Sequence, residues 1–168
     1  MEPVLEEIAS ANPAVKTRFV PCDLSDQDSV RAAASAIRAR YAAIDVIINN
    51  AAVLGGPAYA TDKYGIELQL STNHVGPFLL TNLLMPSVLA AGRGARVINV
   101  SCHEHRLSPF RFHDYNFSGG ATYDMWTGFG QSKTANVLFS LALTLKLKRR
   151  GVTSTAVVGN PRPFRTAP

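Results

Sequence analysis

The sequence predicts an α/β fold built on a mainly parallel sheet. Short apolar and β-branched segments alternate with longer helical segments along the whole chain. The helical segments between the strands indicate βαβ crossovers rather than hairpins. The 168 residues are 46% hydrophobic and 17% charged, which is ordinary for one globular domain.

The first elements along the chain are a helix, a strand and a second helix. Apolar residues at helical spacing predict a helix over residues 1–10. Residues 16–22 (KTRFVPC) are rich in β-forming residues and predict a short strand. Ser25 followed three residues later by Asp28 predicts a capping box, with Ser25 as the N-cap of a helix that reaches residue 41.

The remaining elements continue the alternation. Residues 44–48 (IDVII) predict a buried strand, and a helical stretch follows from about residue 64 to 91. Residues 95–101 (ARVINVS) predict the next strand, 124–150 a strongly apolar helix, and 152–158 (VTSTAVV) the last strand.

Charge, cysteine content and hydropathy narrow the functional class. Much of the net charge of +5 falls on residues 146–150, in the last turn of a predicted helix, where cations suit the helix dipole. We therefore expect no nucleic-acid partner. No apolar run approaches the ~18 residues of a membrane span, and the acidic N-terminus is no secretory signal. Cys22 and Cys102 form no paired motif, which favours a reducing, cytoplasmic location.

Polar residues follow three of the predicted strands. Asp23 follows the first, Asn49 and Asn50 the second, and Ser101 and Cys102 the third. Ligands bind at the carboxyl ends of strands in open α/β sheets, although single polar residues there are more often caps or turn formers. The His103-Glu104-His105 tract meets no defined ligand spacing, so no metal site is expected.

Together these landmarks resemble a known family. The chain resembles the short-chain dehydrogenase/reductases, which are NAD(P)-dependent oxidoreductases with a Rossmann fold, and above all the branch of the retinol dehydrogenases and WW-domain oxidoreductases. The motifs that carry the resemblance are CDLS at 22–25, NNAA at 49–52, STNHVGPF at 71–78, RVINVS at 96–101 and QSK at 131–133.

The resemblance spans residues 1 to about 158. It implies a partial NAD(P)-binding Rossmann domain over 1–158, and 159–168 is expected to be an irregular Pro/Arg-rich tail. The family's doubly wound sheet would be incomplete and the chain truncated at both ends, because the first two strands and the glycine-rich turn that approaches the pyrophosphate are missing. Strands 16–22 and 44–48 would then present unpaired edges.

The resemblance also assigns roles to residues. Asp23 would lie at the adenine end of the cofactor, Asn50 on the cofactor side of a strand turn, and Lys133 at the nicotinamide ribose. Asn73 would be the helix-kinking member of the catalytic tetrad. The kink has an independent physical reason, because Pro77 has no N–H for the carbonyl of residue 73 and its ring clashes there. In the family this freed carbonyl is thought to hold a water.

Two catalytic positions depart from the family pattern. The tyrosine expected four residues before Lys133 is Phe129, which has no proton to give. The serine position is Cys102, and a thiol is a weak donor. Tyr123 is off the Lys133 face and does not substitute. The candidate catalytic residues are therefore Asn73, Cys102, Phe129 and Lys133, in a degenerate site that predicts impaired or absent activity, as in a pseudoenzyme.

Three functions follow as alternatives. The first is NADP- or NAD-dependent oxidation or reduction of a small lipophilic alcohol or carbonyl. The second is a non-catalytic interaction protein that forms a homo-oligomer or associates with a full-length relative. The third is a non-redox biosynthetic enzyme that uses the old pocket. The missing second strand removes the residues that select NAD or NADP.

Overall fold

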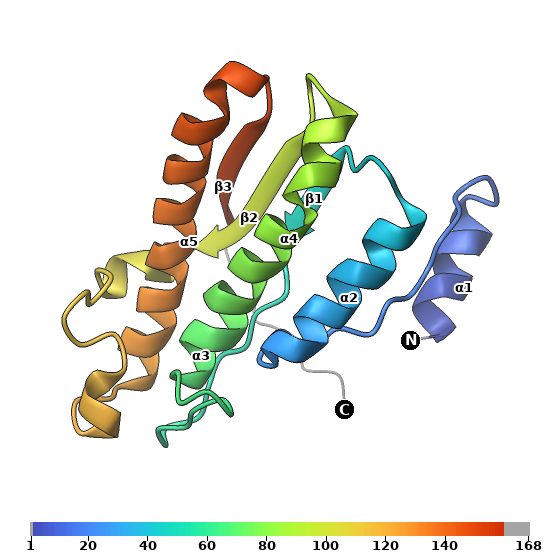
Figure 1. The fold of residues 1–168 in the computed structure, drawn as a ribbon. Coiled ribbons are helices and arrows are strands. Elements are labelled where there is room, and N and C mark those ends of the chain that lie inside the picture. The colour runs from blue at the N-terminus through green and yellow to red at the C-terminus, as the bar shows by residue number, and fades with distance from the viewer. Residues whose placement is uncertain (1, 160–168) are drawn as a thin grey trace.

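Three parallel strands form the sheet in the computed structural model, which describes residues 2–159 (Figure 1). They are β1 (Val46–Asn49), β2 (Arg96–Cys102) and β3 (Thr153–Gly159), in the spatial order β1-β2-β3. Ile47 pairs with Val97, and Val97 pairs with Ser154. The predicted α/β fold with a parallel sheet is confirmed. The predicted tail lies, apart from Gly159, outside the described residues.

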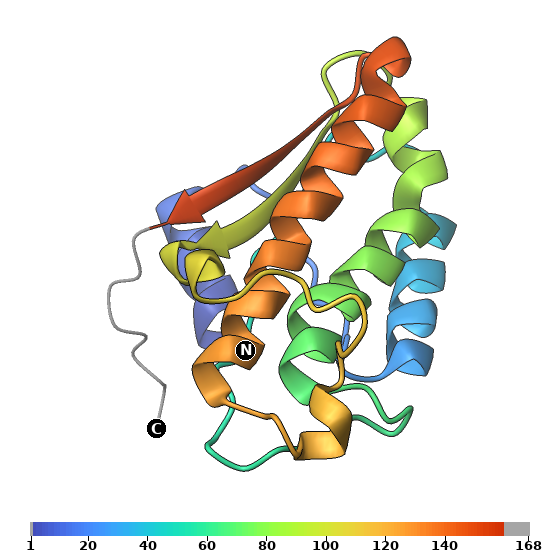
Figure 2. The same cartoon turned by 90° about the vertical axis from the view of Figure 1, so that its left-hand side faces the viewer.

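Three helices cover one face of this sheet. They are α2 (Gln27–Arg40), α4 (Gly76–Ala91) and α5 (Met125–Leu147), which lie to one side of the strands in Figure 2. Side chains alternate along a strand, so one face of each strand enters the core. That core contains Ile47, Leu84, Val88, Val97, Leu143 and Val152.

The long central helix changes its winding at the site. A short α3 (Leu68–Leu70) runs into a π-helical turn (Ser71–Val75), which runs into α4. Pro77 lies in the first turn of α4 and has no N–H, while the Gly76 N–H bonds to Ser71 O, five residues back. The predicted break in regular winding is therefore present as a π turn. The helix also begins later than residue 64, because Asp62 holds a turn through the N–H groups of Tyr64 and Ile66.

The run Leu68–Ala91 is long and apolar enough, by length and composition, to cross a membrane. In this fold it packs against α2 and contacts β1. A helix that covers a sheet can meet the same criterion, so its hydropathy is weak support for a membrane span.

The predicted strand over residues 16–22 is wrong. The helix before it, α1 (Glu2–Ala11), ends one residue after the predicted end at residue 10, but no strand forms in the following segment. Its side chains are mostly exposed, including Phe19 at 48%. A strand requires a neighbour to hydrogen-bond, and no described strand lies beside this segment.

The predicted N-cap Ser25 is also wrong by one residue. Asp26 caps α2, and its side chain accepts from Asp28 N at 2.9 Å. The Ser25 hydroxyl instead donates to Asp23 Oδ1 at 2.7 Å. Asp28 does not close a capping box, because its carboxylate binds Lys63 at 2.9 Å.

The other connections contain short 3₁₀ turns. These are His103–Leu107, Phe117–Gly120 and Lys148–Arg150. The last one ends α5 three residues before the predicted end, and Gly151 follows in the left-handed region with φ 70°. The basic cluster thus lies at a helix end, where the dipole favours it.

Candidate active site

The candidate site lies at the carboxyl end of β2, where α5 passes beside it. Lys133 is only 3% exposed. Its Nζ donates to Val100 O at 3.3 Å and lies 5.4 Å from the centre of the Phe129 ring. Phe129 and Lys133 are one helical turn apart and share the buried face of α5, so a ring with no proton occupies the position beside the amine.

The Cys102 thiol completes this cluster at the end of β2. Cys102 is buried, and that burial together with the neighbouring Glu104 carboxylate raises its pKa to about 11. The thiol is therefore protonated near neutral pH and is not a ready nucleophile. Burial lowers the pKa of Lys133, while the negative charge of the Glu104 carboxylate opposes that shift.

Asn73 joins the cluster from the π turn. Its side chain binds Val53 twice, since Oδ1 accepts from Val53 N at 2.7 Å and Nδ2 donates to Val53 O at 2.9 Å. The same Nδ2 donates to Ser132 Oγ at 3.0 Å. Its main-chain carbonyl accepts from Asn136 Nδ2 at 3.1 Å. A side chain of the protein thus donates to this carbonyl.

Four of the predicted site residues therefore gather in one place, and two do not. Asn73, Cys102, Phe129 and Lys133 surround the contact between the π turn, β2 and α5. Asp23 and Asn50 are exposed. The Asp23 carboxylate accepts from Ser25, and no hydrogen bond or ion pair within residues 2–159 joins Asp23 or Asn50 to Lys133.

Sequence reasoning missed a buried polar chain beneath the site. Asn49 Nδ2 donates to Asn99 Oδ1 at 2.7 Å and to Thr81 Oγ1 at 2.9 Å. Asn99 Nδ2 then donates to Ser140 Oγ at 2.8 Å. A signal for part of this chain was present, because Lys133, Asn136 and Ser140 are polar residues at helical spacing on an apolar helix.

Tyr123 has a structural role, which agrees with its rejection as a substitute for the missing tyrosine. It precedes α5, and its hydroxyl accepts from Gln69 Nε2 at 3.0 Å and donates to Gly56 O at 3.3 Å. Its ring packs edge-on against Phe117 and Tyr59. No group of three or more His, Cys, Asp or Glu side chains among the described residues could hold a metal ion.

A buried carboxylate starts the helix that carries Asn73. Glu67 is 1% exposed, and its two oxygens accept from Gln69 N at 3.0 Å and Leu70 N at 2.7 Å. These bonds satisfy N–H groups that a helix start otherwise leaves without partners. Burial raises the pKa of Glu67, and the N–H donors oppose that shift only partly.

We expect Glu67→Gln to change the pH dependence of stability. A carboxyl whose pKa is raised on folding binds its proton more tightly in the folded state, so its contribution falls as pH rises from the ordinary value of 4.5 through the raised pKa. The free energy of unfolding of the wild type should therefore decline relative to Glu67→Gln across that interval. Urea unfolding at several pH values measures this. Glu6→Gln, on exposed α1, is the control, and parallel curves for wild type and Glu67→Gln would contradict the expectation.

Comparison with known proteins identifies a matching family model and relatives with similar sequences. The family model described as short chain dehydrogenase matches residues 1–167. Retinol dehydrogenase 12 of Bos taurus is 42% identical over 135 residues, covering 80% of this chain and 42% of the relative. Retinol dehydrogenase 11 of Homo sapiens is 36% identical over 156 residues, covering 93% of this chain and 48% of the relative. The chain thus spans less than half the length of these two relatives.

Solved structures give the same result for the fold. An uncharacterized protein from Mycobacterium paratuberculosis superposes with a TM-score of 0.74 at 35% identity, covering 93% of this chain and 54% of that one. A metagenomic short-chain oxidoreductase in complex with NADP superposes with a TM-score of 0.71 at 24% identity, covering 96% and 66%. The α/β layout of this chain therefore corresponds to part of a larger Rossmann-like fold.

Proposed function

Because the chain belongs to the short-chain dehydrogenase family, we propose that it carries an impaired NADP- or NAD-dependent oxidoreductase site for a small lipophilic alcohol or carbonyl. The observation that carries this proposal is the pairing of a buried Lys133 with Phe129, which retains one half of a proton-transfer pair and lacks the other. The substrate class is supported by the similarity to proteins named retinol dehydrogenases.

The residues present define what the site can do. A bound nicotinamide would supply or accept the hydride. The proton that accompanies hydride transfer needs a donor within hydrogen-bond reach, and general acid–base assistance contributes about 10²–10⁴-fold. Phe129 has no such proton, and the protonated Cys102 is a weak hydrogen-bond donor to a carbonyl. Lys133 can still hold a hydroxyl group and place positive charge beside it.

The residues fit only the nicotinamide half of the cofactor. Lys133 has ammonium hydrogens beyond the one that binds Val100 O. For the diphosphate, the family uses backbone N–H groups of a glycine-rich turn. The 168-residue sequence contains no Gly-x-Gly-x-x-Gly. For these 168 residues by themselves, we therefore propose weak cofactor binding that depends on the nicotinamide end alone.

Cofactor titrations test this proposal. We expect NADPH and reduced nicotinamide mononucleotide, which lacks the adenylate half, to bind the 168-residue chain with dissociation constants within about tenfold of each other, or about 1.4 kcal/mol. Lys133→Met should weaken both, and calorimetry or ligand fluorescence measures the affinities. Micromolar NADPH binding, 100-fold tighter than the mononucleotide, would show that this chain holds the diphosphate.

We also propose that the chain acts in a reducing compartment. Cys22 and Cys102 are both free thiols. Disulfides are rare in the cytosol, so a cytoplasmic site of action is consistent with both side chains.

A second candidate function is a non-catalytic interaction protein, and the uncovered part of the sheet favours it. Exposed apolar side chains include Val46 at 38%, Ile48 at 60% and Val157 at 45%. β1 is also an edge strand, and no strand pairs with its outer side among the described residues. Such an edge pairs readily with another chain, and a second copy or a longer relative could supply the strand.

Ile48→Lys tests this second candidate. A charged side chain at this position of the edge strand should oppose association, because a lysine would have to be desolvated. Sedimentation velocity of the wild type should show self-association at micromolar concentration that Ile48→Lys removes. Ala36→Lys, on the exposed side of α2, is the matched control. This candidate function would be rejected if the wild type is monomeric and also shows no binding to human retinol dehydrogenase 11.

A further inference from the structure

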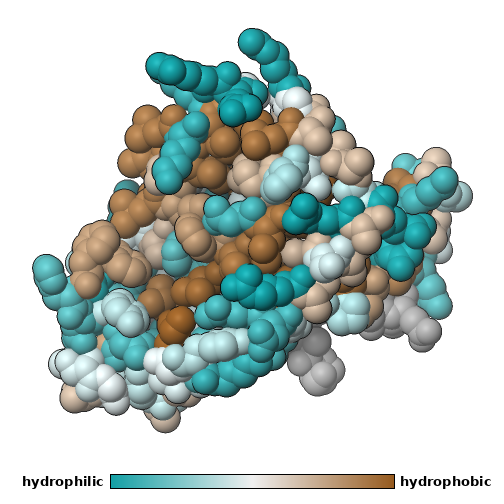
Figure 3. All heavy atoms as spheres, in the orientation of Figure 1, coloured by the Kyte–Doolittle hydropathy of each residue, from teal (hydrophilic) through white to brown (hydrophobic). Residues whose placement is uncertain are grey.

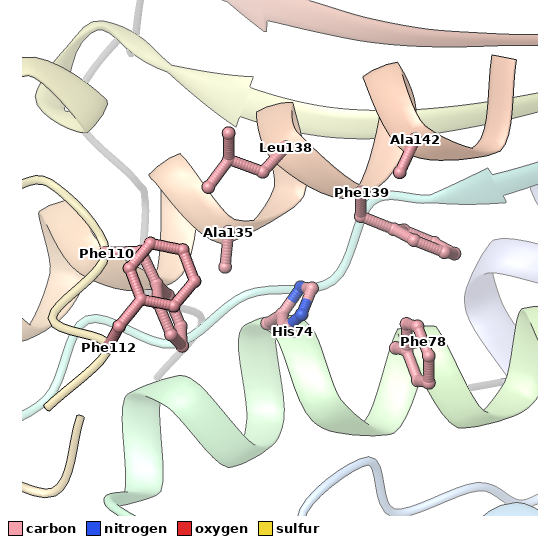
Figure 4. A pocket seen from close by; sticks show the side chains of 8 residues that line it. All are labelled: His74, Phe78, Phe110, Phe112, Ala135, Leu138, Phe139 and Ala142. Atoms are coloured by element: carbon pink, nitrogen blue, oxygen red, sulfur yellow. The ribbon is translucent and has the colours of Figure 1, made fainter. Parts of the chain in front are cut away.

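An aromatic pocket lies between α4 and α5 on the side of α5 that faces away from Lys133. Its volume is about 240 Å³. Figure 4 shows its walls, which come from the π turn and α4, from α5 and from the loop before residue 113. Most lining side chains are apolar; the six largest are His74, Phe78, Phe110, Phe112, Leu138 and Phe139.

The rings form two groups that face each other across the pocket. His74, Phe78 and Phe139 have centroids 5.0–6.1 Å apart, and Phe110 and Phe112 are 4.9 Å apart. Several rim residues remain exposed, with Phe112 at 73% and Phe78 at 46%. Figure 3 shows hydrophobic residues gathered over this pair of helices. Apolar area left in water is costly, so an apolar ligand that covers it gains affinity.

The hydrogen bonds around His74 determine which of its two ring nitrogens carries the hydrogen. Asn136 Nδ2 donates to Asn73 O, which can only accept, so Asn136 Oδ1 is the atom that faces His74 Nδ1 at 3.0 Å. Because that oxygen also only accepts, Nδ1 carries the imidazole hydrogen. Burial lowers the pKa of His74, which keeps the ring neutral near pH 7.

The other ring nitrogen is then a free acceptor. In a neutral imidazole whose Nδ1 carries the hydrogen, Nε2 has a lone pair and no hydrogen. Within residues 2–159, no group donates to His74 Nε2. The pocket therefore combines aromatic walls with one side-chain hydrogen-bond acceptor, and none of its lining residues carries a carboxylate, an ammonium or a guanidinium.

We propose that this pocket binds a small lipophilic molecule with one hydroxyl group, whose O–H donates to His74 Nε2 while its ring system packs among the phenylalanines. A hydrocarbon of the same shape would leave the acceptor unpaired, and an ether offers no donor. An anionic ligand would find no cation among the lining residues. The site is separate from the cluster at Lys133, and the inference does not depend on the proposed function.

Binding of 1-naphthol and 1-methoxynaphthalene tests this inference, because the pair differs in the hydrogen-bond donor and shares the two-ring body. We expect the wild type to bind 1-naphthol at least tenfold more tightly, measured by calorimetry. His74→Phe keeps a ring and removes the acceptor, so it should bind the two compounds equally. Phe112→Ala should weaken both, while Leu141→Ala, on α5 but outside the pocket, should weaken neither.

A second readout uses the wild type alone, in case His74→Phe fails to fold. Nitrogen-15 NMR of the imidazole should show Nε2 of His74 as the unprotonated nitrogen, and 1-naphthol should shift that resonance while 1-methoxynaphthalene does not. Equal affinities, no binding of 1-naphthol, or an unshifted Nε2 would overturn the proposal. A dimer that excludes 1-naphthol would also overturn it, because this face would then belong to a second copy of the chain.

Discussion

Gly76→Ala is expected to destabilise the chain by about 3 kcal/mol or more. An alanine Cβ at this position would lie 2.2 Å from Leu24 O and 2.9 Å from Leu24 C. Both are main-chain atoms, so no side-chain rotation can relieve the clash. Leu24 leads into α2, and relief would therefore require α2 to move away from α4, against which it packs.

The sign of this change in the free energy of unfolding is informative, because helix propensity by itself predicts that Gly76→Ala stabilises the chain. Alanine is favoured over glycine inside a helix by about 1 kcal/mol, so any net loss must come from the contact with Leu24. Urea unfolding measures the change. Gly56→Ala is the matched control, because no atom lies within 4 Å of its added Cβ. A loss below about 1 kcal/mol for Gly76→Ala would contradict the close approach of these segments.

The elements that sequence reasoning predicted correctly are those defined by local physics. Apolar spacing and strand composition predict α2, α5 and the three strands, because each pattern reports which face will be buried. Pro77 predicts a disturbance of the central helix, since a missing N–H acts wherever the residue lies. The structure places a π turn over Ser71–Val75, which ends two residues before Pro77.

The wrong predictions concern hydrogen-bond partners that the sequence does not specify. Residues 16–22 have the composition of a strand, but strand formation requires a neighbour, and none is described there. Ser25 and Asp26 are adjacent cap formers, and the choice between them depends on Asp23, which binds the Ser25 hydroxyl.

The candidate site likewise contains features that local sequence predicts and features that depend on tertiary packing. Family motifs predict the cluster of Cys102, Phe129 and Lys133, because these residues have fixed spacing on one strand end and one helix. The Asn49–Asn99 bond could not be predicted, since it depends on the register between β1 and β2. The Asn136 amide at the Asn73 carbonyl depends on how two helices pack.

Phe129→Tyr combined with Cys102→Ser is expected to raise carbonyl reduction by about 10²–10⁴-fold over the wild type. The Phe129 ring is 4% exposed and its centre lies 5.4 Å from Lys133 Nζ. A phenol there would gain a hydroxyl beside an ammonium, which favours the phenolate and lowers the phenol pKa toward the working range. The hydroxyl introduced by Cys102→Ser would supply a stronger donor than the thiol.

The experiment separates proton donation from cofactor placement. Rates are measured with a panel of lipophilic aldehydes at saturating reduced nicotinamide mononucleotide and at high NADPH. Phe129→Leu, which changes the side chain without adding a hydroxyl, should give no gain, and Cys102→Ser alone should give a smaller one. The rate of the double variant should fall as pH rises through the phenol pKa, because reduction needs the protonated form.

Each outcome identifies the limiting defect. A gain with both nucleotides would mean that the missing proton donor limits turnover, as the Lys133–Phe129 contact implies. A gain with NADPH alone would mean that this chain holds the adenylate half, against the half-site proposed above. A wild type already as fast as the double variant would mean that another group donates the proton. The Lys133 ammonium, whose pKa is lowered by burial, would then be the first to replace.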